Sequence, residues 1–317
     1  MASYLKRDGY NRSLMQTLLI LSSNAPEYRQ RIEAARLPDL EFTDAPEDCE
    51  IVLGEPKLIR DMLPRLDSLK WAQAIYAGVE RLMDPGLRRD YILTNARDVF
   101  GELMSEFVFG YLLLHEKKIF ERYQAQQAKQ WDRAESGVLR GKTIGLLGVG
   151  SIGSHLASTA RHFGMSVHGF TRESESSKEV DRYFHEPHIL KFADGLDYLV
   201  SVLPRTNDTN KIVNASLLDA LPSHAIFMNV GRGNAVDEPA LVTALNDGKI
   251  AAAVLDVTEK EPLPQDHPFW TTPNLLLTFH TSAISYPEDI IKLFVENYHL
   301  YRQGQPLKYQ VDFEKGY

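Results

Sequence analysis

The stretch GLLGVGSIGSHLA, residues 145–157, decides the fold of this chain. Its glycines Gly148, Gly150 and Gly153 follow the apolar run KTIGLL and precede a helical pattern. In that context the first glycine permits a tight strand-to-helix turn, and the second lets the backbone approach a pyrophosphate. The third lets the helix pack on the strand, and amides at the helix start bind phosphate oxygens. The stretch therefore predicts a dinucleotide site in preference to an ordinary βα turn.

The rest of the chain repeats the alternation of strand and helix on both sides of this stretch. Downstream, six strand-like runs are present: KTIGLLG, MSVHGF, LDYLVSVLP, AIFMNVG, IAAAVLDV and NLLLTFH. That is the strand number of a dinucleotide-binding sheet. Upstream, TLLILSS, CEIVLG and KWAQAIYAG alternate with the helical patterns PEYRQRIEAARL and PKLIRDMLPRL. Both series predict parallel sheets covered by helices, so we expect an α/β fold with two lobes.

Two further segments bear on how these lobes are assembled. The segment from Glu102 to Gln127 lacks proline and is apolar on nearly every side at its start. Such a helix is expected to be buried all round, between domains or against a second subunit. The last pattern, YPEDIIKLFVENYHLYRQG, has a proline and acidic residues at its start and Gly304 at its end, which predicts a helix. We expect this helix to cross back to the first lobe.

Composition narrows the class of protein. The 317 residues carry a formal net charge of −8, which disfavours nucleic acid or an anionic membrane as a partner. Cys49 is the single cysteine, so no intrachain disulfide can form, as is common in reducing compartments. No apolar run at the start is long enough for a secretion signal or a membrane span. We expect a cytoplasmic protein that binds a small molecule and needs no metal.

The residues after the second strand of the dinucleotide series bear on which cofactor is bound. A sheet of this kind that binds NAD usually places an acidic residue there for the ribose hydroxyl. This chain has Thr171 and Arg172, and a guanidinium suits the additional 2′-phosphate of NADP. Glu173 follows and can still serve a ribose, and Arg172 can also be a solvated loop charge. The pattern favours NADP(H) and leaves NAD(H) open.

Three charged or titratable residues follow later strands of the same series. Arg232 follows AIFMNVG, Glu261 lies in the loop after IAAAVLDV, and His280 ends NLLLTFH. Ligands of doubly wound sheets bind beyond the carboxyl ends of the strands, so these side chains are expected to converge. Arginine binds a carboxylate with two hydrogen bonds, and histidine titrates near neutral pH. Each residue alone has an ordinary structural explanation, but together they predict acid–base chemistry on an organic acid.

The order and spacing of these motifs resemble the D-isomer-specific 2-hydroxyacid dehydrogenase family. The resemblance rests on GVGSIG, NVGRG, DVTEKEPLP and HTSA and covers about residues 77–304. It implies a flavodoxin-like substrate domain, residues 1–109 and 285–317, split around a Rossmann domain at residues 110–284. It also implies homodimers, built partly on the long helix. The family often has a glycine soon after the catalytic histidine, where this chain has Thr281, Ser282 and Ala283. It usually has an aspartate where this chain has Glu80, and neither difference touches the proposed chemistry.

The resemblance also implies roles for individual residues. Arg232 resembles the arginine that binds the substrate carboxylate, His280 the acid–base, and Glu261 the partner that raises its pKa. The loop of residues Tyr76, Ala77, Gly78 and Val79 resembles the substrate loop of the family. The resemblance implies that the backbone amides of Gly78 and Val79 bind the substrate carboxylate. Asp256 resembles the acid near the nicotinamide carboxamide, and Met104 takes a position near the same ring. The remaining cofactor contacts implied are Gly148, Gly150, Ser151, Ile152, Gly153, Thr171, Arg172, Leu203, Pro204, Thr209, Val230 and Gly231.

The activity that follows is reduction of a small 2-keto acid to the D-2-hydroxy acid, with glyoxylate or hydroxypyruvate as the default substrate. No group in the first lobe identifies the substrate side chain. Two alternatives remain open. One is a corepressor-like protein of the same fold that senses the cofactor without turnover, and the other is a related formate or phosphite dehydrogenase.

Overall fold

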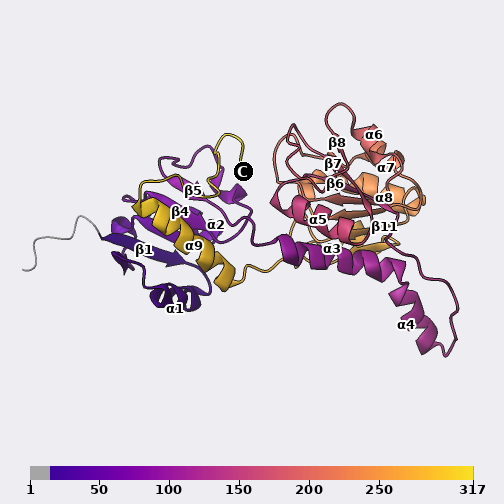
Figure 1. The fold of residues 1–317 in the computed structure, drawn as a ribbon, viewed down its shortest axis with the longest axis horizontal. Helices are drawn as coiled ribbons and strands as arrows, with labels where there is room; N and C mark the ends of the chain where they lie inside the picture. Colours follow the sequence, from indigo (N-terminus) through magenta and orange to yellow (C-terminus); the bar gives the residue numbers. More distant parts are fainter. Residues whose placement is uncertain (1–14, 317) are drawn as a thin grey trace, which may run out of the picture. The chain divides into compact units, whose positions relative to one another are not determined.

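The computed structural model describes residues 15–316 and divides them into two compact units, each built on its own sheet (Figure 1). One unit contains the described residues up to Val99 and resumes at Ser285, and the other is Phe100–Ile284. The sequence predicted that the second unit begins at residue 110. In the structure it begins at Phe100. No helix in the described part of the chain is long and apolar enough to cross a membrane.

The first unit contains a parallel five-stranded sheet in the order β2-β1-β3-β4-β5. This is the strand order of flavodoxin-like folds. Its strands are β1 (Gln16–Leu21), β2 (Leu40–Phe42), β3 (Ile51–Gly54), β4 (Trp71–Ala74) and β5 (Ile92–Thr94). The sequence had predicted β1, β3 and β4. The three-residue strands β2 and β5 are too short to produce a recognisable hydrophobic pattern.

Helices cover both faces of this first sheet. They are α1 (Ala25–Ala35), α2 (Pro56–Met62) and α9 (Pro287–Arg302). Trp71 of β4 stacks on Phe294 of α9 with ring centroids 5.2 Å apart. Its neighbour Ala72 packs in a separate apolar cluster with Ile59 of α2. Because successive side chains of a strand point to opposite faces, α9 and α2 cover opposite faces. The C-terminal helix therefore belongs to the first unit, as the sequence predicted.

The second unit contains a parallel seven-stranded sheet in the order β12-β11-β10-β9-β6-β7-β8. Its strands are β6 (Thr143–Leu147), β7 (Ser166–Phe170), β8 (Arg182–Phe184), β9 (Tyr198–Ser201), β10 (Ile226–Asn229), β11 (Ala252–Leu255) and β12 (Leu275–Leu277). The order is that of a Rossmann sheet extended by one strand. The six predicted strands are present. The edge strand β8 was missed because its three residues, RYF, are too few to produce a recognisable pattern.

Helices also lie on both faces of the second sheet (Figure 1). They are α3 (Gly101–Glu116), α4 (Ile119–Gln127), α5 (Ser151–His162), α6 (Ile189–Ala193), α7 (Ala215–Asp219) and α8 (Glu238–Asn246). One apolar core joins α6, α7 and α8 to the sheet, and α3 packs on α5. Short 3₁₀ helices occur at Pro46–Asp48, Leu63–Arg65, Glu80–Leu82, Gly233–Ala235 and Pro268–Trp270.

The single helix expected between Glu102 and Gln127 is instead two helices, α3 and α4. The chain turns at Lys118, which has a φ of +50° and so leaves the right-handed helical region. Glu116, at the end of α3, is buried and accepts hydrogen bonds from Lys142 and from the Tyr198 hydroxyl. None of the residues of α4 is buried. The prediction of one continuous helix is wrong because the buried face of the segment ends at Glu116.

Candidate active site

The glycine loop between β6 and α5 has the shape that a pyrophosphate requires. Gly148 has a φ of +96°, a conformation that residues with a side chain rarely adopt. A Cβ atom on Gly153 would lie 2.3 Å from the carbonyl oxygen of Gly148, so only glycine lets the helix pack this closely. A Cβ on Gly150 would meet no atom within 4 Å. The side of the loop at Gly150 is therefore open, and the loop fits the phosphates of a dinucleotide.

The predicted ribose contacts follow β7 and are partnered by residues that the sequence did not single out. The Arg172 guanidinium lies 2.8 Å from the Asp208 carboxylate, and both side chains are exposed. The Thr171 hydroxyl donates to the carbonyl of Ser174 at 2.7 Å. His185 lies 3.0 Å from the Thr171 carbonyl, and its contact with Glu175 raises its pKa above the usual value. This end of the site is an exposed cluster of charges.

The loops after β9 and β10 lie against each other. The Thr209 hydroxyl donates to the Pro204 carbonyl at 2.7 Å and closes the loop that contains Leu203. A Cβ on Gly231 would lie 2.6 Å from the backbone nitrogen and oxygen of Leu203. Val230 and Gly231 are both buried. These predicted cofactor residues therefore form one surface at the carboxyl ends of the strands.

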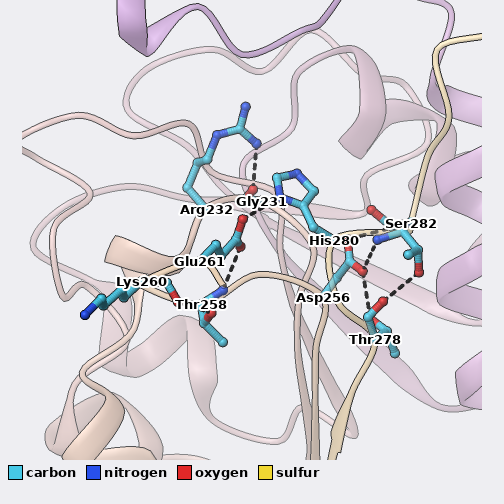
Figure 2. A network of polar contacts seen from close by, with 10 residues as sticks. Gly231, Arg232, Asp256, Thr258, Lys260, Glu261, Thr278, His280 and Ser282 are labelled. Atoms are coloured by element: carbon cyan, nitrogen blue, oxygen red, sulfur yellow. Dashed lines mark hydrogen bonds and ion pairs between the residues drawn. The ribbon is translucent and has the colours of Figure 1, made fainter. Parts of the chain in front are cut away.

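Arg232, Glu261 and His280 come together in the second unit, as Figure 2 shows. The Nδ1 atom of His280 lies 2.8 Å from Oε2 of Glu261. The other oxygen of Glu261 accepts the amide of Thr258 at 3.1 Å. The Arg232 guanidinium donates to the Gly231 carbonyl at 2.8 Å. The side chains of His280 and Glu261 remain 54% and 38% exposed, so a small substrate can reach them.

The two partners shift each other's pKa in opposite directions. The hydrogen bond from Glu261 raises the pKa of His280 above its usual value, and this outweighs partial burial and the nearby Arg232 charge. Partial burial raises the pKa of Glu261, but the hydrogen bonds from His280 and Thr258 together lower it by more. The net shift of the Glu261 pKa is therefore downward. The contact therefore favours the imidazolium form of His280 and the carboxylate form of Glu261, and it leaves Nε2 of His280 for acid–base work.

The loop that presents His280 has an unusual backbone. Phe279 and His280 both have a φ close to +60° (59° and 58°). Such residues cost about 1–3 kcal/mol each and persist only where the surrounding structure holds them. The His280 amide donates to the Asp256 carbonyl at 2.6 Å. The buried Asp256 carboxylate accepts the amides of Thr281 at 2.8 Å and Ser282 at 3.1 Å.

The Asp256 carboxylate also accepts the hydroxyl of Thr278 at 2.7 Å, as Figure 2 shows. In the structure, Asp256 therefore holds the backbone of the loop that carries His280. The contact with the nicotinamide carboxamide that the family resemblance implies for Asp256 stays a prediction.

The loop that carries Arg232 is held by a residue that the sequence analysis missed. Asn229, at the end of β10, is fully buried. Its amide nitrogen donates to the Arg232 carbonyl at 3.0 Å, and its oxygen accepts the Gly231 amide at 3.2 Å. A polar residue ending an otherwise apolar buried strand was the available signal. Because both ends of its side chain are used, Asn229 fixes the backbone from which Arg232 projects.

The other predicted residues belong to different elements of the chain. Tyr76, Ala77, Gly78 and Val79 follow β4 in the first unit, where the Asn95 amide donates to the Ala77 carbonyl at 2.6 Å. Met104 is buried in α3. Their roles stay predictions. Within residues 15–316 there is no group of three or more His, Cys, Asp or Glu side chains that could hold a metal ion.

Comparison with known proteins gives consistent matches. The family model for the D-isomer specific 2-hydroxyacid dehydrogenase NAD binding domain matches residues 109–282. Glyoxylate/hydroxypyruvate reductase A of Yersinia enterocolitica is 32% identical over 279 residues, covering 86% of this chain and 88% of that protein. A family protein from Aeromonas salmonicida has a TM-score of 0.89 and 41% identity, covering 94% of this chain and 99% of its own. A dehydrogenase from Xanthobacter autotrophicus, solved with NADPH and MES, has a TM-score of 0.87 and 31% identity, covering 96% and 100%.

The Rossmann sheet, the glycine loop and the histidine–glutamate pair beside an arginine define a nicotinamide-dependent dehydrogenase. The chain belongs to the D-isomer specific 2-hydroxyacid dehydrogenase family, and is an NAD(P)-dependent enzyme of that family. The resemblance seen in the sequence and the predicted α/β fold class are confirmed.

The glycine loop gives a matched pair of substitutions. We expect Gly153→Ala to lower both the melting temperature and cofactor affinity, because its Cβ would collide with the Gly148 carbonyl. Gly150→Ala should leave the melting temperature of the free protein unchanged, because its Cβ meets open space, yet weaken cofactor binding at least tenfold. Thermal unfolding with and without NADPH, together with fluorescence titration, measures both effects. Full affinity in Gly150→Ala would contradict a pyrophosphate at this backbone.

Proposed function

We propose that the protein reduces a small 2-keto acid of the glyoxylate or hydroxypyruvate type to the D-2-hydroxy acid, with NADP(H) preferred over NAD(H). The single observation that carries the proposal is the 2.8 Å bond between His280 and Glu261 beside Arg232. The substrate class is supported by the name of the Yersinia relative, glyoxylate/hydroxypyruvate reductase A. The cofactor preference is supported by Arg172 and by the NADPH bound to the Xanthobacter structure.

The nicotinamide, when bound, supplies the hydride that adds to the keto carbon. Arg232 binds and orients the substrate carboxylate through its guanidinium. His280 donates the proton on Nε2 to the keto oxygen, which becomes the hydroxyl of the product. Glu261 stays ionised and hydrogen-bonded to Nδ1 of His280. It therefore stabilises the imidazolium before proton transfer and fixes the orientation of the ring. The family resemblance assigns further carboxylate contacts to the Gly78 and Val79 amides.

The choice of cofactor depends on Arg172. Its guanidinium is held by Asp208 at 2.8 Å on an exposed surface. A 2′-phosphate carries more charge and more acceptor oxygens than one carboxylate, so it competes well for a guanidinium. Glu173 and Glu175 lie in the same loop and disfavour a phosphate there. We therefore propose a preference for NADP(H) that leaves NAD(H) usable.

We also propose that the protein forms a homodimer through α3 and α4. The apolar side chains of Leu103, Phe107, Tyr111 and Leu114 on α3 remain partly exposed, although the sequence predicts burial on every side. Ile119, Phe120 and Tyr123 of α4 are 49%, 51% and 59% exposed. Figure 1 shows α4 and the chain after it standing away from the sheet of the second unit. A hollow between α3, α4 and strands β10–β12 is lined mainly by apolar residues. A second copy of the chain accounts for this surface.

The first test follows absorbance at 340 nm with NADPH and NADH, each against glyoxylate, hydroxypyruvate, pyruvate and a bulky aromatic keto acid. We expect the small acids to be reduced fastest, with NADPH. Arg172→Ala should raise the KM for NADPH about tenfold or more, because a charge-assisted contact contributes about 1.5–3 kcal/mol. The KM for NADH should change little.

Asp208→Asn is the matched control, because it releases Arg172 without removing it, so NADPH affinity should hold or improve. Equal use of both cofactors, unchanged in Arg172→Ala, would contradict this role of Arg172. Cofactor binding without turnover of any acid would favour the sensor alternative.

The second test is the pH dependence of reduction. Reduction needs protonated His280, whose pKa is raised, so kcat should be constant at lower pH and fall as the pH rises through that pKa. Glu261→Gln removes the supporting charge, so the fall should move to lower pH by about one pH unit or more. His280→Ala should lower kcat by about 10²–10⁴-fold and leave NADPH affinity nearly unchanged. A flat profile between pH 6 and 9 would contradict the assignment.

The third test concerns the dimer. Phe120→Asp with Tyr123→Asp places charge on the exposed face of α4 and should convert dimers to monomers. Light scattering coupled to size-exclusion chromatography measures the mass. Leu190→Asp, at a residue of α6 that is 48% exposed, is the control and should remain dimeric. A monomeric wild-type protein would overturn the proposal.

A further inference from the structure

A second carboxylate–histidine pair lies next to the loop that carries Glu261. Glu238 is the first residue of α8, and its side chain is only 13% exposed. One of its oxygens, Oε1, accepts the amide of Glu259 at 2.9 Å. The other, Oε2, lies 3.2 Å from Nε2 of His267. The Glu238 carboxylate therefore joins α8 to two points of the segment between β11 and β12.

The attachment at Glu259 lies inside the turn that aims Glu261. Thr258, on one side of it, donates its amide to Glu261 and its hydroxyl to the carbonyl of Lys260 at 3.0 Å. The turn has no helix or strand to hold it. Its backbone also lies so close to Gly233 that a Cβ there would be 2.0 Å from the Thr258 carbonyl. The position of Glu261 thus depends on contacts that this turn makes with neighbouring segments.

His267 fixes the direction of the Glu238 carboxylate. Its Nδ1 accepts the amide of Phe269 at 3.3 Å, and its ring packs edge-on against the buried Phe269 ring with centroids 4.6 Å apart. A histidine that accepts at Nδ1 carries its proton on Nε2, so it donates from Nε2 to Glu238. Both oxygens of Glu238 are then used, and its rotamer is fixed from two sides.

We propose that Glu238 is a positioning residue that holds the Thr258–Glu261 turn and so keeps Glu261 in hydrogen-bonding contact with Nδ1 of His280. This inference rests on the proposed role of the His280–Glu261 pair. Glu238 touches neither substrate nor cofactor in this scheme and acts only through the Glu259 amide. Without it the turn relaxes, the bond to His280 lengthens, and the imidazolium loses support. The charged groups that act on His280 are Glu261, Arg232 and Asp256, and all three remain in a Glu238 variant.

The experiment compares two substitutions at the start of the same helix, one at its N-cap residue Asp237 and one at its first residue Glu238. Glu238→Ala removes the attachment of the turn, whereas Asp237→Ala removes the helix cap, in which Asp237 accepts the Ala240 amide at 3.3 Å. The pKa of His280 is measured directly by NMR titration of the imidazole, with His280→Gln used to assign the signal. The pH profile of kcat, the KM for cofactor and the melting temperature are measured alongside.

We expect Glu238→Ala to lower the pKa of His280 and move the fall in kcat to lower pH. It should reduce kcat near neutral pH about tenfold and leave the KM for NADPH unchanged. Asp237→Ala should lower the melting temperature and leave the His280 titration in place. Glu238→Gln keeps an oxygen for the Glu259 amide and should restore most of the titration. His267→Ala, which leaves Glu238 present but less constrained, should show the same change as Glu238→Ala in smaller measure.

An unchanged His280 titration in Glu238→Ala, or an equal change in Asp237→Ala, would overturn the proposal. If Glu238→Ala does not fold, His267→Ala decides it by the same titration: a shift to lower pH supports the proposal, and an unchanged titration overturns it. The NMR measurement needs no turnover. A shifted titration in a protein without keto-acid reduction would therefore support the positioning role of Glu238 and refute the proposed function.

Discussion

The 2.8 Å hydrogen bond between His280 and Glu261 joins two loops that have no regular structure of their own. A histidine this exposed keeps a raised pKa only while the carboxylate stays on Nδ1, because water otherwise competes for both groups. The bond therefore depends on how firmly each loop is held. The parallel sheet ends all its strands at one edge and so brings the two loops together, but it leaves their conformation open.

Polar groups that the chain buries or half buries supply that conformation. Asp256 holds the histidine loop by two backbone amides, Asn229 holds the arginine loop at both ends of its amide, and Glu238 holds the turn of Glu261. In each case a side chain bonds to backbone, which fixes the path of the chain whatever residues project from it. A buried acceptor left without its donors costs about 1–3 kcal/mol, so alternative loop conformations are disfavoured.

The cofactor end of the site is organised differently. Arg172 and Asp208 are 55% and 73% exposed, and their contact is screened by salt. Because an exposed ion pair contributes little free energy, an exposed guanidinium can leave its carboxylate partner at little cost to bind a phosphate. The proposed catalytic loops, held by hydrogen bonds from buried side chains, and the exposed Arg172–Asp208 pair thus lie at the same edge of one sheet. Each suits its proposed role, because proton transfer needs fixed geometry, whereas recognition of a phosphate depends mainly on charge.

The sequence by itself determined the glycine loop, six of the seven strands of the second sheet, the C-terminal helix, and the order of Arg232, Glu261 and His280. These features are local patterns, in which a strand alternates, a helix repeats, and a special backbone conformation demands glycine. The strands β2, β5 and β8 have three residues each and are not part of a longer apolar run of the kind that revealed β12. The break at Lys118 comes where the burial of α3 ends, which the sequence does not record. Only the tertiary structure decided that Asn229, Glu238 and His267 hold the site together. Glu238 and the Glu259 amide are separated along the chain and meet only after the sheet has formed. A sequence pattern does not predict which carboxylate will accept which backbone amide in this way.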